Sequence, residues 1–248
     1  MTGAGLAARA FFVLLGPFAG DYAATWAASW PRLPRPLVGA SRCARCDAPI
    51  PPARRIPLLS WLLQRGRRAC CGGRIPIVYP LGEAAGLVAG VAAAAASQLS
   101  VQAWTFALGL TLAYVALVDL RRFSIPIAGL AALAVEVALA LTREPTLEAR
   151  LARLATGAVL ALALELLRRF AARGRRSGLG GGDVLLAALL GALVGWRYAA
   201  PMVAAAALAP LGVQALRRRS GPVAFGAWLC AAAATTLLTA RLLSLVPA

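Results

Sequence analysis

Long apolar stretches constrain the fold of this chain more than any other feature. Hydrophobic residues make up 60% of the sequence, whereas a soluble domain is closer to half apolar. A helix needs about 20 mainly apolar residues to span a bilayer. The candidate stretches lie at residues 6–30, 77–97, 101–120, 125–141, 151–167, 183–200, 201–216 and 223–246. They predict an all-α integral membrane protein with about eight transmembrane helices, of which the sixth and seventh are separated only by a tight turn near residues 197–201.

The distribution of basic residues over the connections tests the predicted number of helices. All 26 basic residues are arginine. The arginine-rich connections lie at residues 31–76, 121–122, 168–176 and 217–219. They alternate along the chain with weakly charged connections. Since basic residues concentrate on the cytoplasmic side of membrane proteins, we expect both termini outside the cytoplasm and the long first loop inside it. The net charge of +17 is thus expected to orient helices in a lipid membrane, and no nucleic-acid partner is expected.

Two aspartates stand at the ends of apolar stretches. Asp119 ends a predicted helix that runs toward the cytoplasm, and Asp183 begins one that runs away from it. Both are therefore expected at the cytoplasmic edge of the bilayer, where a carboxylate is costly unless it has a role. Two neighbouring carboxylates cannot both ionise easily, so one keeps its proton while the other acts as a base. This pair predicts aspartic proteolysis, in which the base activates water and the acid protonates the peptide carbonyl.

Each aspartate also has a simpler interpretation. Asp183 follows three glycines and could cap its helix, while Asp119 could form an ion pair with Arg121 or Arg122. The glycines would allow an extended substrate to approach the carboxylate closely. Acids in membrane helices also mark ion paths, so a multi-pass transporter is an alternative. A transporter would be expected to carry acids nearer the bilayer centre, often in repeated halves.

Four of the five cysteines lie in the long first loop. Cys43 and Cys46 have metal-ligand spacing, and Cys70 and Cys71 follow about 24 residues later. Four thiolates predict a structural zinc site. The alternative is reduced thiols without a metal, since a disulfide is less expected in the cytoplasm. Cys230 lies alone in an apolar stretch and is interpreted as a packing residue. Because the chain has no histidine, a histidine base or ligand is excluded.

Several segments resemble motifs of the type IV prepilin peptidases. Asp119-Leu-Arg-Arg-Phe-Ser-Ile125-Pro126 is similar to the motif of their first catalytic aspartate, and Gly180-Gly-Gly-Asp183 to that of the second. Residues 55–66 resemble an Ile-Pro-x-Leu-Ser-Trp signature, and residues 75–83 resemble a Tyr-Pro-x-x-Glu segment. Residues 222–226 are loosely similar to a Pro-Phe-Gly region at the last helix.

The resemblance implies an aspartic endopeptidase that removes a basic leader from prepilins or pseudopilins. It implies cleavage after a glycine and before an apolar helix, at the cytoplasmic face of the bacterial inner membrane. Asp119 and Asp183 are then the expected catalytic residues. The residues expected to bind substrate are Gly180, Gly182, Ile125 and Pro126.

A second activity is also implied, because many family members methylate the new N-terminus with S-adenosylmethionine. The resemblance divides the chain into a methyltransferase-like part at residues 1–97, which includes the loop at 31–76, and a six-helix peptidase core at residues 98–248. Glu83 matches an acidic position of the first part and is the expected cofactor-binding residue.

The chain departs from the family pattern at four places, and those at Leu185 and Arg68 keep a catalytically inactive member open as an alternative. Ile127, directly after Ile-Pro, stands where the family commonly has asparagine or aspartate. Leu185 stands where the family usually has lysine, two residues after the second aspartate. Arg68 stands where the third zinc-binding cysteine is expected, so that Cys70 would have to substitute for it. Asp21 lies within a first-helix segment that differs from the family pattern. Its side chain is interpreted either as forming a hydrogen bond inside the protein or as contacting a substrate amine.

Overall fold

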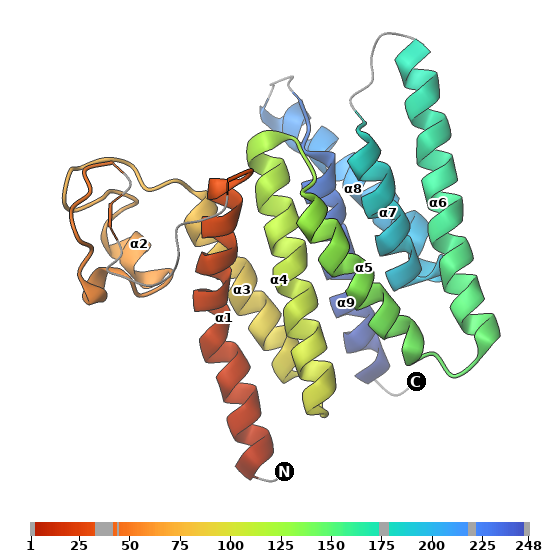
Figure 1. Ribbon diagram of the computed structural model, residues 1–248, viewed down its shortest axis with the longest axis horizontal. Helices are drawn as coiled ribbons and strands as arrows, with labels where there is room; N and C mark the ends of the chain where they lie inside the picture. The colour runs from red at the N-terminus through yellow and green to blue at the C-terminus, as the bar shows by residue number, and fades with distance from the viewer. Residues whose placement is uncertain (1–2, 33–41, 44, 174–178, 218–221, 246–248) are drawn as a thin grey trace. The chain divides into compact units, whose positions relative to one another are not determined.

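The fold consists of helices and their connecting loops over the residues that the computed structural model describes, which are 3–32, 42–43, 45–173, 179–217 and 222–245. Within them, the only β-type pairing consists of two isolated bridges in the first loop. The long helices are α1 Gly3–Ser29, α3 Val78–Ala94, α4 Leu99–Arg122, α5 Ile127–Thr142, α6 Leu147–Arg173, α7 Gly181–Val194, α8 Trp196–Arg217 and α9 Phe225–Leu245 (Figure 1). Two short helices, η1 Pro52–Arg54 and α2 Leu59–Leu63, lie in the loop. The all-helical prediction is confirmed.

The apolar character of the helices supports a membrane location. Two helical segments of the described residues, Leu99–Arg122 and Trp196–Leu216, are long and apolar enough to cross a membrane. The shorter apolar helices include α3, α5 and α7. The arrangement of eight membrane spans stays a prediction.

The chain divides into two compact units, Met1–Leu117 and Val118–Ala248. The boundary falls within α4, so that the last turns of this helix belong to the second unit. The expected division into parts 1–97 and 98–248 rests on the family resemblance and stays a prediction.

In the first unit, α1 and α3 pack against each other through glycines. Gly16 of α1 lies against the Gly86 carbonyl of α3, and Gly90 lies against the Phe12 carbonyl, so closely that a Cβ atom at either glycine would collide with backbone. Residues four apart share one helix face, which places Gly82, Gly86 and Gly90 in a row. Small residues in such a row let two helix backbones approach closely, as is common among helices packed in lipid.

In the second unit, α7 is the central helix. It packs against α5, α6, α8 and α9, and most of its residues are buried. Gly157 of α6 lies against the Ala188 carbonyl of α7, so this pair also approaches closely through a glycine. The burial of α7 fixes the position of its first turn, which carries Asp183.

The turn between the sixth and seventh long helices corrects the sequence prediction. We expected it near residues 197–201, but α7 ends at Val194 and α8 begins at Trp196 and continues through Pro201. Gly195 makes the break, because its φ of 77° lies in a region that glycine adopts more readily than other residues. The Arg153 guanidinium donates to the Leu193 carbonyl at 2.5 Å and stabilises this end.

Candidate active site and cysteine cluster

Asp119 lies in the last turns of α4 and is buried, with 4% of its surface exposed. Its Oδ2 accepts a hydrogen bond of 2.9 Å from the backbone N–H of Ala227, 108 residues later in the sequence. Ala227 is in the first turn of α9, where backbone N–H groups lack partners within the helix. The partial negative charge at the C-terminus of α4 would disfavour the Asp119 carboxylate, but the partial positive charge at the N-terminus of α9 favours it. Among the ion pairs of the described residues, none joins Asp119 to Arg121 or Arg122.

Asp183 is the third residue of α7, which begins two residues earlier than predicted. Its Oδ2 accepts a hydrogen bond of 2.9 Å from the Gly180 N–H. Asp183 therefore does take part in capping, but as the third residue of α7 that accepts from the N-cap residue Gly180, and not as the N-cap residue itself. The side chain is buried, with 9% exposed, and its other oxygen, Oδ1, faces α9.

Gly226 is the point at which the two carboxylates converge. A Cβ atom on Gly226 would lie 3.1 Å from Asp119 Oδ2 and 3.3 Å from Asp183 Oδ1. Both oxygens therefore border the space that the missing side chain leaves, and their charges interact. The sequence pointed to Gly226 only through the loose similarity of residues 222–226, and Ala227 was not singled out at all.

The other residues expected to bind substrate surround this point in different ways. Ile125 packs against Gly182, where a Cβ atom would lie 3.0 Å from the Ile125 Cβ, and it also contacts Gly226. Pro126 is fully buried and precedes α5. Gly180 is exposed. Contact of these residues with a substrate stays a prediction. Leu185 is 58% exposed, so it adds no charge and little packing to the pair of acids.

Cys230 is buried one turn beyond Gly226 on α9, as expected for a packing residue. The structure also buries an acid that sequence reasoning did not single out, Glu136 in the middle of α5.

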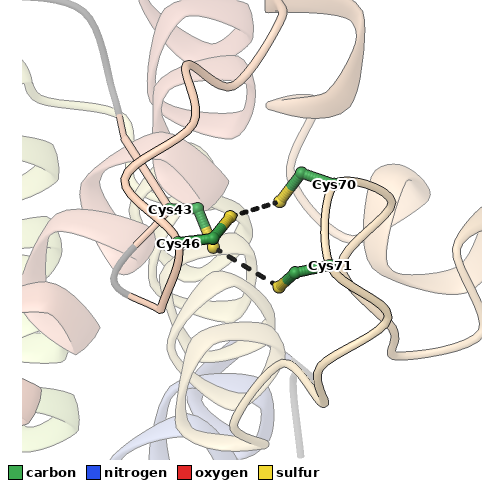
Figure 2. A group of neighbouring side chains, drawn as sticks. All are labelled: Cys43, Cys46, Cys70 and Cys71. Atoms are coloured by element: carbon green, nitrogen blue, oxygen red, sulfur yellow. Dashed lines mark hydrogen bonds between the residues drawn. The ribbon is translucent and has the colours of Figure 1, made fainter.

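Four cysteines of the first loop form a compact cluster (Figure 2). The sulfur atoms of Cys43, Cys46, Cys70 and Cys71 all lie within 4.8 Å of one another. The Cys46–Cys70 and Cys43–Cys71 sulfur distances are 3.4 and 3.9 Å. Thiolates bound to one tetrahedral zinc ion at about 2.3 Å lie roughly 3.8 Å apart, so the cluster fits that geometry. Cys70, adjacent to Cys71, does reach the other thiols.

Two backbone turns hold the cysteines in place. Asp47 N–H donates to the Cys43 carbonyl, and Gly72 N–H donates to the Arg68 carbonyl. Each turn is closed by an isolated bridge, Arg42–Pro49 in one and Arg67–Arg74 in the other. Backbone N–H groups of Arg45 and Cys46 lower the pKa of the Cys43 thiol to about 6, which favours the thiolate that binds metals.

Glu83 in α3 is tied to the same loop. Its Oε2 accepts a hydrogen bond of 2.6 Å from the Leu58 backbone N–H, and the side chain is buried. Asp21 of α1 is near enough for its charge to interact with Glu83. Glu83 therefore anchors the loop to α3, whereas its expected role in cofactor binding stays a prediction.

Comparisons with known proteins cover most of the chain. Residues 14–97 match the family model of the bacterial peptidase A24 N-terminal domain, and residues 106–215 match that of the type IV leader peptidase family. The chain is 32% identical over 198 residues to a prepilin leader peptidase/N-methyltransferase of Pectobacterium carotovorum subsp. carotovorum, over 76% of this chain and 70% of that protein. It is 34% identical over 214 residues to a protein of the same description from Dickeya chrysanthemi, over 80% and 72% of the two chains. No solved structure matches the chain.

Proposed function

The chain belongs to the type IV leader peptidase family, and on this basis we propose that it is an aspartic endopeptidase acting on prepilins or pseudopilins. It removes their basic leader after a glycine and before an apolar helix. The observation that carries the assignment of the catalytic residues is the convergence of Asp119 and Asp183 at Gly226. The two relatives share the peptidase description.

The geometry supports a mechanism in which the two carboxylates share one proton. Each carboxylate accepts a backbone N–H at the start of a helix, from Ala227 for Asp119 and from Gly180 for Asp183. Ionisation of both acids at this spacing is unfavourable, so one stays protonated. The ionised partner takes a proton from water, which attacks the peptide carbonyl carbon. The protonated partner donates to the carbonyl oxygen, and the tetrahedral intermediate then releases the leader and a new amino terminus.

The membrane arrangement belongs to the same proposal. Eight spans with both termini outside place Asp119 and Asp183 at the cytoplasmic face of the bacterial inner membrane and the cysteine loop in the cytoplasm, in accord with the arginine distribution. Contact with lipid is supported by large apolar side chains that are exposed along single helices. Those of α6 include Leu154, Val159, Leu162 and Leu166.

Zinc and a methyl donor are the two proposed cofactors. The four clustered thiols fit a structural zinc ion, which would hold the two turns of the loop together and has no open position for chemistry. N-methylation with S-adenosylmethionine is supported by the description of the two relatives. Glu83 is bound to the Leu58 backbone and does not by itself make a site for that cofactor.

Cleavage of a synthetic prepilin tests the peptidase proposal. The purified protein in detergent is expected to cut a substrate with a Gly-Phe or Gly-Met junction. Asp119→Asn and Asp183→Asn keep the shape of the side chain and are each expected to abolish cleavage. Glu148→Ala changes an exposed acid in the first turn of α6 and is the matched control. The proposal is contradicted if the native chain does not cleave, as an inactive member or a transporter would not, or if either asparagine variant keeps full activity.

A further inference from the structure

The cysteine-bearing loop carries an exposed apolar surface at α2. Its members are large aliphatic side chains, exposed from 46% for Ile56 to 74% for Leu63: Ile56, Leu59, Leu62 and Leu63. The Ser60 N–H donates to the Ile56 carbonyl at 2.9 Å, so the helical turns begin at Ile56. Because residues three and four apart share one side of a helix, these four side chains form a single apolar face. Exposed apolar surfaces of this kind mark contacts with a partner or a membrane.

The other side of α2 is held by the loop itself. A Cβ atom on Gly66 would lie 3.2 Å from Cζ2 of Trp61, so the indole ring packs against this glycine. The Gly66 N–H also donates to the Trp61 carbonyl at 2.9 Å. The loop thus uses Trp61 for its own packing and leaves the apolar face uncovered.

Arginines border the apolar face at both of its ends. Arg54 and Arg55 precede it, Arg65 and Arg67 follow it, and all four are exposed. The sequence has no acidic residue between Asp47 and Glu83. Among the ion pairs of the described residues, none includes any of the four arginines. A segment that is apolar in the middle and basic around it fits an anionic lipid surface, which offers acyl chains beneath negatively charged headgroups.

A buried hydrogen bond ties this segment to the first turns of α3. The Leu58 N–H, at the start of α2, donates to Glu83 Oε2 at 2.6 Å. Leu58 has a φ of 61°, a conformation that a residue other than glycine keeps only where its surroundings hold it. Glu83 is five residues beyond Val78, the first residue of α3, which is about 8 Å along a helix. The headgroup layer on each side of a bilayer is about 5–8 Å thick. In the proposed membrane arrangement, the contact therefore holds α2 at the depth of the headgroups.

We infer that the apolar face of α2 docks into the surface of an anionic lipid bilayer and anchors the cysteine loop there. Ile56, Leu59, Leu62 and Leu63 enter the boundary between headgroups and acyl chains, and the bordering arginines contact the lipid phosphates. The inference rests on the proposed membrane location of α3 and does not depend on the reaction that the two aspartates catalyse.

Hydrogen exchange of the full chain in lipid nanodiscs tests the inference. Discs with one copy of the protein are made from phosphatidylcholine or from anionic phosphatidylglycerol. The backbone N–H groups of Ser60, Leu62 and Gln64 donate within the helical turns of this segment, so their exchange reports its opening. We expect exchange about tenfold slower or more in phosphatidylglycerol, because several arginines are each attracted to an anionic surface. A single copy without substrate leaves neither a second chain nor a prepilin to cover the face.

Three variants separate the apolar face from the charges around it. Leu63→Glu places a carboxylate on the face and should abolish the slowing. Ala53→Glu makes the same charge change at an exposed residue of η1, outside the face, and is the matched control that should keep most of it. Arg54→Gln combined with Arg65→Gln should bring the exchange rates in the two lipids closer together.

The amides that close the cysteine turns show whether the loop stays folded. The N–H groups of Asp47 and Gly72 should exchange at the native rate in all variants. Equal exchange of the α2 amides in both lipids, or slowing retained in Leu63→Glu, overturns the inference. So does an unchanged lipid difference in the double arginine variant, or equal loss of the slowing in Ala53→Glu and Leu63→Glu. Cleavage of the synthetic prepilin in the same discs reports on the peptidase proposal separately.

Discussion

Gly226→Ala tests whether the convergence of the two carboxylates depends on a missing side chain. The new Cβ would lie 3.1 Å from Asp119 Oδ2 and 3.3 Å from Asp183 Oδ1, and closer still to the Ile125 Cδ1 atom. These contacts are shorter than ordinary van der Waals contacts, so both carboxylates must move or α9 must shift. Either movement lengthens the hydrogen bond from Ala227 N–H to Asp119, now 2.9 Å.

The expected effect follows from that hydrogen bond. A hydrogen bond to a charged group contributes about 1.5–3 kcal/mol, and each 1.36 kcal/mol is tenfold in rate. We therefore expect kcat for a prepilin substrate to fall about 10- to 100-fold. Overpacking costs about 1–3 kcal/mol of stability, and the helix preference of alanine over glycine offsets up to about 1 kcal/mol of it. The variant is therefore expected to remain folded.

Single-turnover cleavage at saturating enzyme and a thermal melt in the same detergent measure the two effects separately. Gly212→Ala in α8 is the control, because a Cβ atom there meets nothing within 4 Å. It should cleave at the native rate. Native kcat in a folded Gly226→Ala protein would refute the idea that this glycine holds the carboxylates together.

Three further predictions use the same kinds of measurement. Gly181→Ala adds a Cβ atom that meets nothing in the protein, so it should leave the melting temperature unchanged. If a substrate backbone passes this glycine, the variant should lower kcat/KM about tenfold. An unchanged kcat/KM would mean that the substrate binds elsewhere. Cys70→Ser should reduce the zinc content measured by metal analysis and the thermal stability of the loop. Cys230→Ser, at a buried site outside the cluster, is the control and should retain the metal. Equal zinc content in both variants would exclude Cys70 as a ligand. Gly86→Val places a side chain against the Gly16 carbonyl and should destabilise the α1–α3 pair by about 1–3 kcal/mol. Denaturant unfolding measures this effect. An unchanged unfolding midpoint would mean that the two helices do not pack this closely.

Several features could be predicted from the sequence because they depend on local composition. Helices formed at the apolar stretches, since length and apolar content along one segment decide whether it forms a buried or lipid-facing helix. The hydrogen bond from the Gly180 N–H to Asp183 at the start of α7 is also local, because the two residues are only three positions apart. It could therefore be anticipated from the sequence. The turn after α7 lies earlier than predicted, because Gly195 breaks the helix and Pro201 lies within α8.

Other features depend on contacts between distant segments. The Ala227 N–H that binds Asp119 is 108 residues away, and no local pattern marks it as a partner. Cys70 was uncertain because adjacent thiols seldom point to one place, and only the turn around Arg68 and Gly72 brings it to the other three.

The amino-acid sequence by itself determined a helical chain with two acids at helix ends and a cysteine-bearing loop, because each of these is a property of residues near one another along the chain. Only the tertiary structure decided that Gly226 lies between Asp119 and Asp183. Oxygens of both carboxylates lie within 3.3 Å of the position that a Cβ atom on Gly226 would take. In the proposed mechanism, this neighbourhood lets the two acids share one proton.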